Sequence, residues 1–226
     1  MSLAHDMMHA DLAADKLLAS LLLTVNGFFY LEYDHLYIHH RHVATPGDPA
    51  SAGKNTGLYK YLPFSIINRL KFIIKRRPKD QLERHYLIKV YILMIAAFMW
   101  LIFSAYLSIY SFIMVSMQYV AVILIYETVT YIQHYGLSRA KKDQYIYEKV
   151  NLSHSWNSYY RYSNYLYFFM PVHGMHHAAV EEMNIQQFAA SPEMPLPFPQ
   201  MLRLAYFPRK WFAVIDPLVE KYKTIN

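Results

Sequence analysis

Apolar residues dominate one stretch of the chain, from Leu87 to Ile132, in which only Lys89 and Glu127 are charged. The stretch is too long for a single membrane crossing, which takes roughly 20 residues, and about right for two. Its centre is more polar than its flanks and is the natural place for a turn. The pattern therefore predicts a transmembrane helical hairpin over 86–134, with helices at roughly 86–107 and 112–134.

Composition supports a membrane protein. Hydrophobic residues make up 55% of the 226 residues and charged residues 17%, against roughly 25% charged residues in a typical soluble domain. The net charge is +6, and basic residues gather between Arg69 and Arg84, just before the apolar stretch. The positive-inside rule predicts that this side faces the cytoplasm or the matrix. The sequence has no stripe of interleaved basic and aromatic residues, the pattern that would indicate a nucleic-acid partner.

Most histidines of this chain lie in clusters. Of the twelve, nine form the candidate metal site: His5, His9, His35, His39, His40, His134, His173, His176 and His177. Residues three or four apart share one face of a helix, so two imidazoles can reach the same ion. We interpret His42, His85 and His154 as surface residues or residues that support the ligands.

The number of histidines bears on the metal. There is no Cys, so any ion must be bound by N or O ligands. Nine imidazoles are too many for a structural zinc ion, which usually takes four ligands. They suit two ions with four or five ligands each, and imidazole accepts Fe, Zn, Cu and Ni alike.

A second apolar segment, Leu12 to Leu31, is long enough to cross a bilayer but has histidine clusters at both ends. A crossing would place these clusters on opposite sides of the membrane. We therefore expect a shallow or re-entrant helix that bends near Gly27. The fold class expected is an all-α membrane protein, one domain over 1–226, with its histidine-rich metal site at one membrane face.

Three motifs resemble the membrane alkane 1-monooxygenase family, a branch of the histidine-rich di-iron hydroxylases and desaturases. The segment Val43–Ser51 follows the second cluster and reads Val-Ala-Thr-Pro-Gly-Asp-Pro-Ala-Ser. Tyr131–Arg139 contains a His-Tyr-Gly motif, and His154–Ser158 reads His-Ser-Trp-Asn-Ser. The resemblance covers nearly the whole chain.

The resemblance implies two irons held by the nine histidines, and insertion of one oxygen atom from O₂ into a terminal C–H bond of an alkyl or acyl chain. It implies a rubredoxin-type electron donor and a bacterial plasma membrane or mitochondrial inner membrane. Asp6, Asp34, Gln133 and His154 are expected beside the ligands. The family carries Glu at the position of Gln133, so Gln133→Glu is expected to keep the metal and, if this chain is an impaired oxygenase, to raise turnover.

Two alternatives to the monooxygenase stay open. The family has several membrane helices before the first cluster, whereas this sequence begins four residues before His5. Either companion chains supply these helices, or the protein has lost them. One alternative is a non-catalytic, metal-retaining subunit of a large membrane assembly, such as a mitochondrial respiratory complex. The other is a lipid desaturase.

Overall fold

The computed structural model describes residues 2–144, 146–177 and 191–225, and its main elements are two long apolar helices. Helix α6 (Gln81–Leu107) has 27 residues and α7 (Ile109–His134) has 26. Each is about 40 Å long at 1.5 Å per residue, against a hydrocarbon core of roughly 30 Å. Both are long and apolar enough to cross a membrane, and the two predicted helices are confirmed.

The described residues are otherwise helix and loop, with β pairing limited to isolated bridges. The remaining helices are α1 (Ser2–Met7), α2 (Ala13–Val25), α3 (Leu31–Asp34), the π-helical turn η1 (His35–His39), α4 (His40–His42), α5 (Leu58–Lys75), the 3₁₀ turn η2 (Leu152–His154), α8 (Arg161–Leu166), α9 (His173–His177), α11 (Phe198–Ala205) and α12 (Pro208–Ile225). The all-α prediction is confirmed.

The chain divides into two compact units, each with its own apolar core. Unit 1 comprises Met1–Ile38 and Arg69–Tyr126, and unit 2 comprises His39–Asn68 and Glu127–Asn226. The core of unit 1 includes Phe28, Leu31 and Leu87. That of unit 2 is built around larger side chains, among them Trp156 and Trp211.

In unit 1, α2 is too short to cross a bilayer. Its 13 residues span about 20 Å, and the chain turns back directly after it. Gly27 makes this turn with a φ of +73°, a left-handed conformation that glycine adopts without strain. A Cβ atom at Gly27 would lie 2.3 Å from the ring of Tyr119 on α7. The predicted bend near Gly27 is therefore present.

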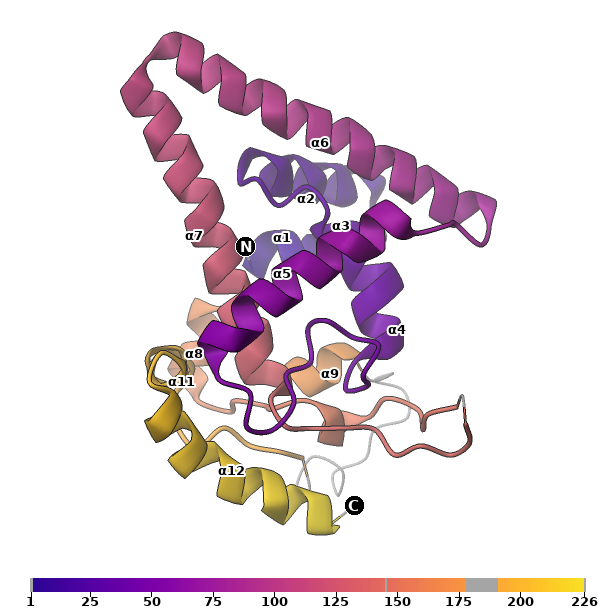
Figure 1. Cartoon of the computed structure of the whole chain (residues 1–226), viewed down its shortest axis with the longest axis vertical. Helices are drawn as coiled ribbons and strands as arrows, with labels where there is room; N and C mark the ends of the chain where they lie inside the picture. The colour runs from indigo at the N-terminus through magenta and orange to yellow at the C-terminus, as the bar shows by residue number, and fades with distance from the viewer. Residues whose placement is uncertain (1, 145, 178–190, 226) are drawn as a thin grey trace. The chain divides into compact units, whose positions relative to one another are not determined.

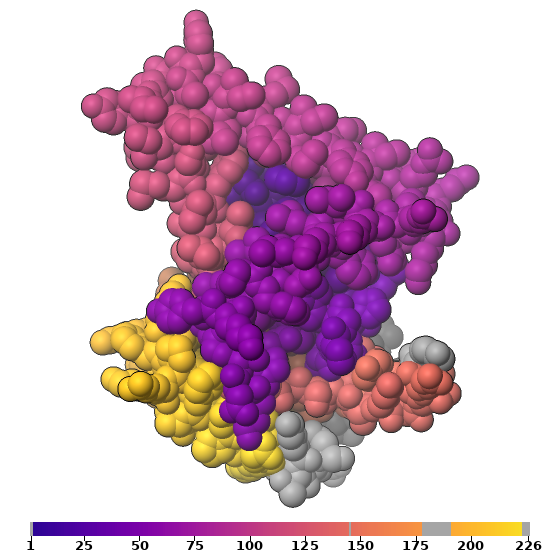
Figure 2. Space-filling model, viewed as in Figure 1, coloured from indigo at the N-terminus to yellow at the C-terminus, as the bar shows by residue number. Residues whose placement is uncertain are grey.

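Helices α6 and α7 diverge from the turn at Ser108 (Figure 1). The segment of α2 and its turn contacts both of them: α2 packs on α6, and the Gln118 amide of α7 donates to Asn26 Oδ1 at 2.9 Å. The face of α6 that carries Ile92, Met99 and Ile102 is apolar and exposed. Figure 2 shows the space-filling surface of this helix. An apolar face of this size on a long helix is suited to contact with lipid.

In unit 2, the C-terminal helices α11 and α12 lie next to each other in the structure (Figure 1). Trp211 and Val219 of α12 are fully buried in the core of the unit. Gly136, with a φ of +71°, ends α7 so tightly that a Cβ atom there would lie 2.7 Å from Val219. This close packing lies directly after the last turn of α7, which carries the fully buried His134.

Candidate metal centre

Four histidines of unit 2 converge on one point. His39 ends the η1 turn, His134 is the last residue of α7, and His173 and His177 are the first and last residues of α9. One ring nitrogen from each lies within 4.8 Å of those of the other three. His173 Nε2 is 3.1 Å from His134 Nε2 and 2.8 Å from His177 Nε2. We call these four residues the unit 2 group.

The spacing of these nitrogens suits a metal ion. Two imidazole nitrogens bound at about 2.1 Å and separated by 90–110° about one ion would be about 3.0 to 3.4 Å apart. The separations from His173 Nε2 to the two neighbouring Nε2 atoms, 3.1 and 2.8 Å, are close to this range. The four residues therefore fit a centre bound through nitrogen.

The other five predicted ligands also meet histidine partners. In unit 1, His5 Nε2 lies 3.0 Å from His35 Nε2, and the His9 ring centroid is 5.6 and 5.2 Å from those of His5 and His35. In unit 2, His40 Nε2 lies 3.1 Å from His176 Nε2. The set of nine as metal ligands stays a prediction, although each member has an imidazole neighbour.

The second histidine cluster has an unexpected backbone. Spacing alone predicts an α-helix, but His35–His39 forms a π-helical turn, η1. Such turns are rare, with i→i+5 hydrogen bonds, and are frequent at functional sites. The first cluster also departs from a simple helix, because α1 ends at Met7 and His9 lies in the turn after it.

Burial favours the neutral form of two of these histidines, His177 and His9. Burial, followed by the nearby imidazoles of His173 and His39, holds the pKa of His177 well below its usual range. Burial also lowers the pKa of His9, against the opposing effect of Asp6. A neutral imidazole has the lone pair that a metal ligand needs, so the environment favours the binding form.

A buried carboxylate that the sequence analysis did not single out contacts this group. Asp48 Oδ2 lies 2.9 Å from His39 Nδ1, and both side chains are fully buried. Burial alone would raise the pKa of Asp48, but the adjacent His39 and the Ser51 hydroxyl lower it below its ordinary value. The available signal was the place of Asp48 within Val43–Ser51, one of the motifs that carry the family resemblance.

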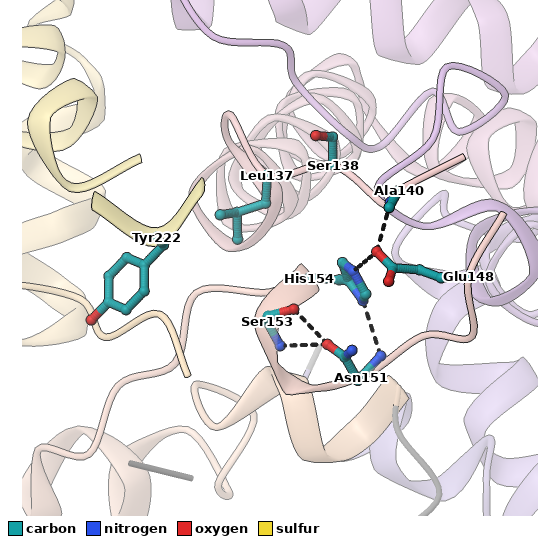
Figure 3. Close-up of a pocket in the computed structure, with 8 residues that line it drawn as sticks. All are labelled: Leu137, Ser138, Ala140, Glu148, Asn151, Ser153, His154 and Tyr222. Carbon is teal, nitrogen blue, oxygen red and sulfur yellow. Dashed lines mark hydrogen bonds and ion pairs between the residues drawn. The ribbon is translucent and has the colours of Figure 1, made fainter. Parts of the chain in front are cut away.

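His134 is contacted by backbone rather than by a carboxylate. Its Nδ1 lies 3.3 Å from the carbonyl oxygen of His154, so His154 contacts the group through its backbone and not through its ring. That ring is held from both sides: Nε2 is 3.0 Å from Glu148 Oε1, and Nδ1 accepts from the Asn151 amide at 3.0 Å. Figure 3 shows this arrangement in a pocket of about 290 Å³.

The other predicted supporting residues have different surroundings. Asp34 is fully buried and ion-paired with Arg69 in unit 1. Asp6 is exposed on α1. Gln133 is buried, and its side-chain amide donates to the carbonyl oxygen of Met170 at 3.2 Å. His85 is exposed on α6, which fits its interpretation as a surface residue.

The chain is similar in sequence to several known alkane 1-monooxygenases. Alkane 1-monooxygenase 1 of Pseudomonas aeruginosa is 32% identical over 97% of this chain and 59% of its own length. Alkane 1-monooxygenase 2 of the same organism is 31% identical over 98% and 61%, and alkane 1-monooxygenase 2 of Alcanivorax borkumensis 28% over 98% and 60%. The chain thus spans about three fifths of the length of these relatives.

A family model described as fatty acid desaturase matches residues 1–181, a range that includes all nine clustered histidines. The histidine-lined centre and the two apolar helices thus occur in a chain that matches this model and the relatives over most of its length. The chain belongs to the fatty acid desaturase family and is similar to alkane 1-monooxygenases.

Proposed function

We propose that this chain is a di-iron membrane monooxygenase that hydroxylates a terminal C–H bond of an alkyl or acyl chain with O₂. The observation that carries the proposal is the convergence of four imidazoles in the unit 2 group, within 4.8 Å of one another. The similarity to alkane 1-monooxygenases supports the same reaction.

The reaction balances with an external electron donor. One atom of O₂ enters the C–H bond, the other leaves as water, and two electrons and two protons are consumed. A rubredoxin-type protein is the class of donor proposed. Iron bound at the histidines would supply the redox chemistry.

The chain's own residues would bind, orient and shield. His134 and His173 present Nε2 atoms to the centre, and the backbone behind His134 fixes the direction of its ring. Burial of His39, His134 and His173 keeps bulk water away. The exposed apolar face of α6 would lie in lipid, from which an apolar substrate would arrive, with the centre on the cytoplasmic or matrix side.

Metal content is the first test. The protein, purified in detergent with any companion chains retained, should contain about two irons per chain by elemental analysis. His134→Ala should lower the iron content to about one or none, and the exposed His85→Ala is the matched control that should keep it. Absence of iron, or a single zinc, would contradict the monooxygenase and favour the non-catalytic subunit.

A second candidate, desaturation, is favoured by the description of the matching family model. Both reactions would use the same iron centre, so metal content does not separate them. Product analysis with saturated alkyl and acyl substrates does: an alcohol supports hydroxylation, and an alkene supports desaturation.

A further inference from the structure

The carboxylate of Asp48 accepts hydrogen bonds from three different groups. The amide of Ala50 donates to Oδ1 at 3.0 Å, and the hydroxyl of Ser51 donates to Oδ2 at 2.7 Å. Nδ1 of His39 lies 2.9 Å from the same Oδ2. All of these residues belong to unit 2.

The directions of these bonds can be assigned from the chemistry of the donors. A backbone N–H can only donate. The Ser51 oxygen already accepts from the amide of Ala44 at 2.9 Å, which leaves its hydroxyl proton for the carboxylate. An ionised carboxylate can only accept, so Nδ1 of His39 must carry the proton in this bond.

We propose that Asp48 is a positioning residue that fixes His39 in the tautomer whose Nε2 lone pair faces the other histidines of the unit 2 group. With Nδ1 bonded to Asp48, the proposal assigns Nε2 of His39 to the metal ion. The His39 ring centroid lies 4.7 Å from those of His134 and His177. The proposal rests on the proposed function, because it assigns a purpose to the metal group.

Asp48 is an anionic partner for His39, whereas the partner of His134 is uncharged. His134 faces a neutral backbone carbonyl, whereas His39 faces an anion. A carboxylate bonded to a ligating imidazole raises the basicity of that ligand and fixes its orientation, and its loss typically costs 10–100-fold in metal affinity. Asp48 would thus act on the ligand as well as on its tautomer.

Asp48→Asn gives a sharp test because it nearly keeps the shape. The Asn oxygen would be held by the Ala50 amide, which turns the NH₂ group toward His39. Nδ1 would then have to accept, moving the ring proton to Nε2 and blocking metal binding. Asp48→Ala should weaken metal binding less than Asp48→Asn. Asp48 borders a cavity of about 350 Å³, from which water could hydrogen-bond to Nδ1 and leave the ring proton there.

The experiment uses the full chain in detergent and two readouts. Nitrogen-15 NMR of the metal-free protein with labelled histidine, with His39 assigned from a His39→Gln variant, reports which ring nitrogen carries the proton. Titration with Co(II), followed by visible absorption, reports metal affinity. We expect Nδ1–H in the wild type, Nε2–H in Asp48→Asn, and a Co(II) affinity ranked wild type, Asp48→Ala, Asp48→Asn.

Two controls test the specificity of the effect. Asp143→Asn makes the same substitution on an exposed loop and should change neither readout. Ser51→Ala removes one donor to Asp48 without touching His39 and should keep Nδ1–H, which serves as a milder variant if those at Asp48 fail to fold. Asp48→Asn should weaken Co(II) binding at least about tenfold.

The proposal is overturned if folded Asp48→Asn keeps Nδ1–H on His39 or binds Co(II) as well as the wild type. It is also overturned if Ser51→Ala shows Nε2–H. The tautomer is measured without metal, so its result decides the role of Asp48 even if the native protein contains no iron and the proposed function fails.

Discussion

The side-chain amide of Gln133 donates a hydrogen bond of 3.2 Å to the carbonyl oxygen of Met170, three residues before His173. A Glu at this position would turn an acceptor toward an acceptor. We expect Gln133→Glu to lose about 2 kcal/mol or more of unfolding free energy, because a buried polar group without its partner costs about 1–3 kcal/mol. This cost opposes the gain in turnover predicted from sequence.

The measurement is thermal unfolding of the metal-free protein. The control is Gln118→Glu, because Gln118 is on the same helix and also donates to an oxygen, but its bond is exposed. Gln118→Glu should lose much less stability. Equal stability of Gln133→Glu and wild type would show that the amide of Gln133 is dispensable.

Gly27 is predicted to be essential for the bend after α2. In Gly27→Ala the new methyl group would meet the Tyr119 ring at 2.3 Å, on a backbone with a φ of +73°. The left-handed conformation alone costs roughly 1–2 kcal/mol for a residue with a Cβ atom, and the clash adds to it. Gly53→Ala, where a Cβ atom would meet nothing closer than 3.8 Å, should unfold at the wild-type temperature.

Asp34 and Arg69 form an ion pair whose side chains are 0% and 1% exposed. Arg69→Met would leave a buried carboxylate without this partner, at a cost of about 3–5 kcal/mol. Adding Asp34→Asn should recover part of the loss in a denaturant unfolding experiment. The pair Lys54–Glu220 is much more exposed, and Lys54→Met should cause no measurable loss. Additive losses in the double variant would contradict a direct pairing.

Glu148 predicts a pH effect with a defined sign. Burial would raise its pKa, but bonds from the Ala140 amide and His154 lower it below the ordinary value of 4.5. Its stabilising contribution, about 1 kcal/mol, is therefore present at neutral pH and is lost as the pH falls below about 4.5, because the unfolded chain takes up the proton first.

Unfolding temperatures of the metal-free protein between pH 7 and pH 4 test this sign. Glu148→Gln should unfold at a lower temperature than wild type at pH 7, with a gap that narrows toward pH 4. The exposed Glu193→Gln should follow the wild type throughout. If the difference in unfolding temperature between Glu148→Gln and wild type widened on acidification, the pKa of Glu148 would be raised by folding rather than lowered.

Hydrophobicity and spacing predicted the features that depend on neighbouring residues. The long apolar stretch gave α6 and α7, because two crossings need about that many apolar residues. Histidine clusters at both ends of 12–31 cannot share a site across a membrane, which predicted a bend in this segment, and Gly27 supplies the bend.

Contacts between residues far apart in the sequence could not be predicted from hydrophobicity and spacing. Arg69 lies among the basic residues to which the positive-inside rule was applied, yet it pairs with Asp34, 35 residues away in sequence. The histidines of the π-helical turn at His35 are spaced in the sequence as they would be on an α-helix. No sequence pattern there distinguishes the two kinds of helix. The contacts of the α2 segment with both α6 and α7 are not contained in a hydropathy pattern.

The boundary between the two units falls inside helical elements at all three places where the chain crosses it. Ile38 and His39 are consecutive in η1, Asn68 and Arg69 in α5, and Tyr126 and Glu127 in α7. Chains are usually divided, permuted or recombined at exposed linkers. Here each cut would break a helix, and the first would separate His35 from His39 and His40. Neither unit is therefore a module that could be cut from the chain at a linker.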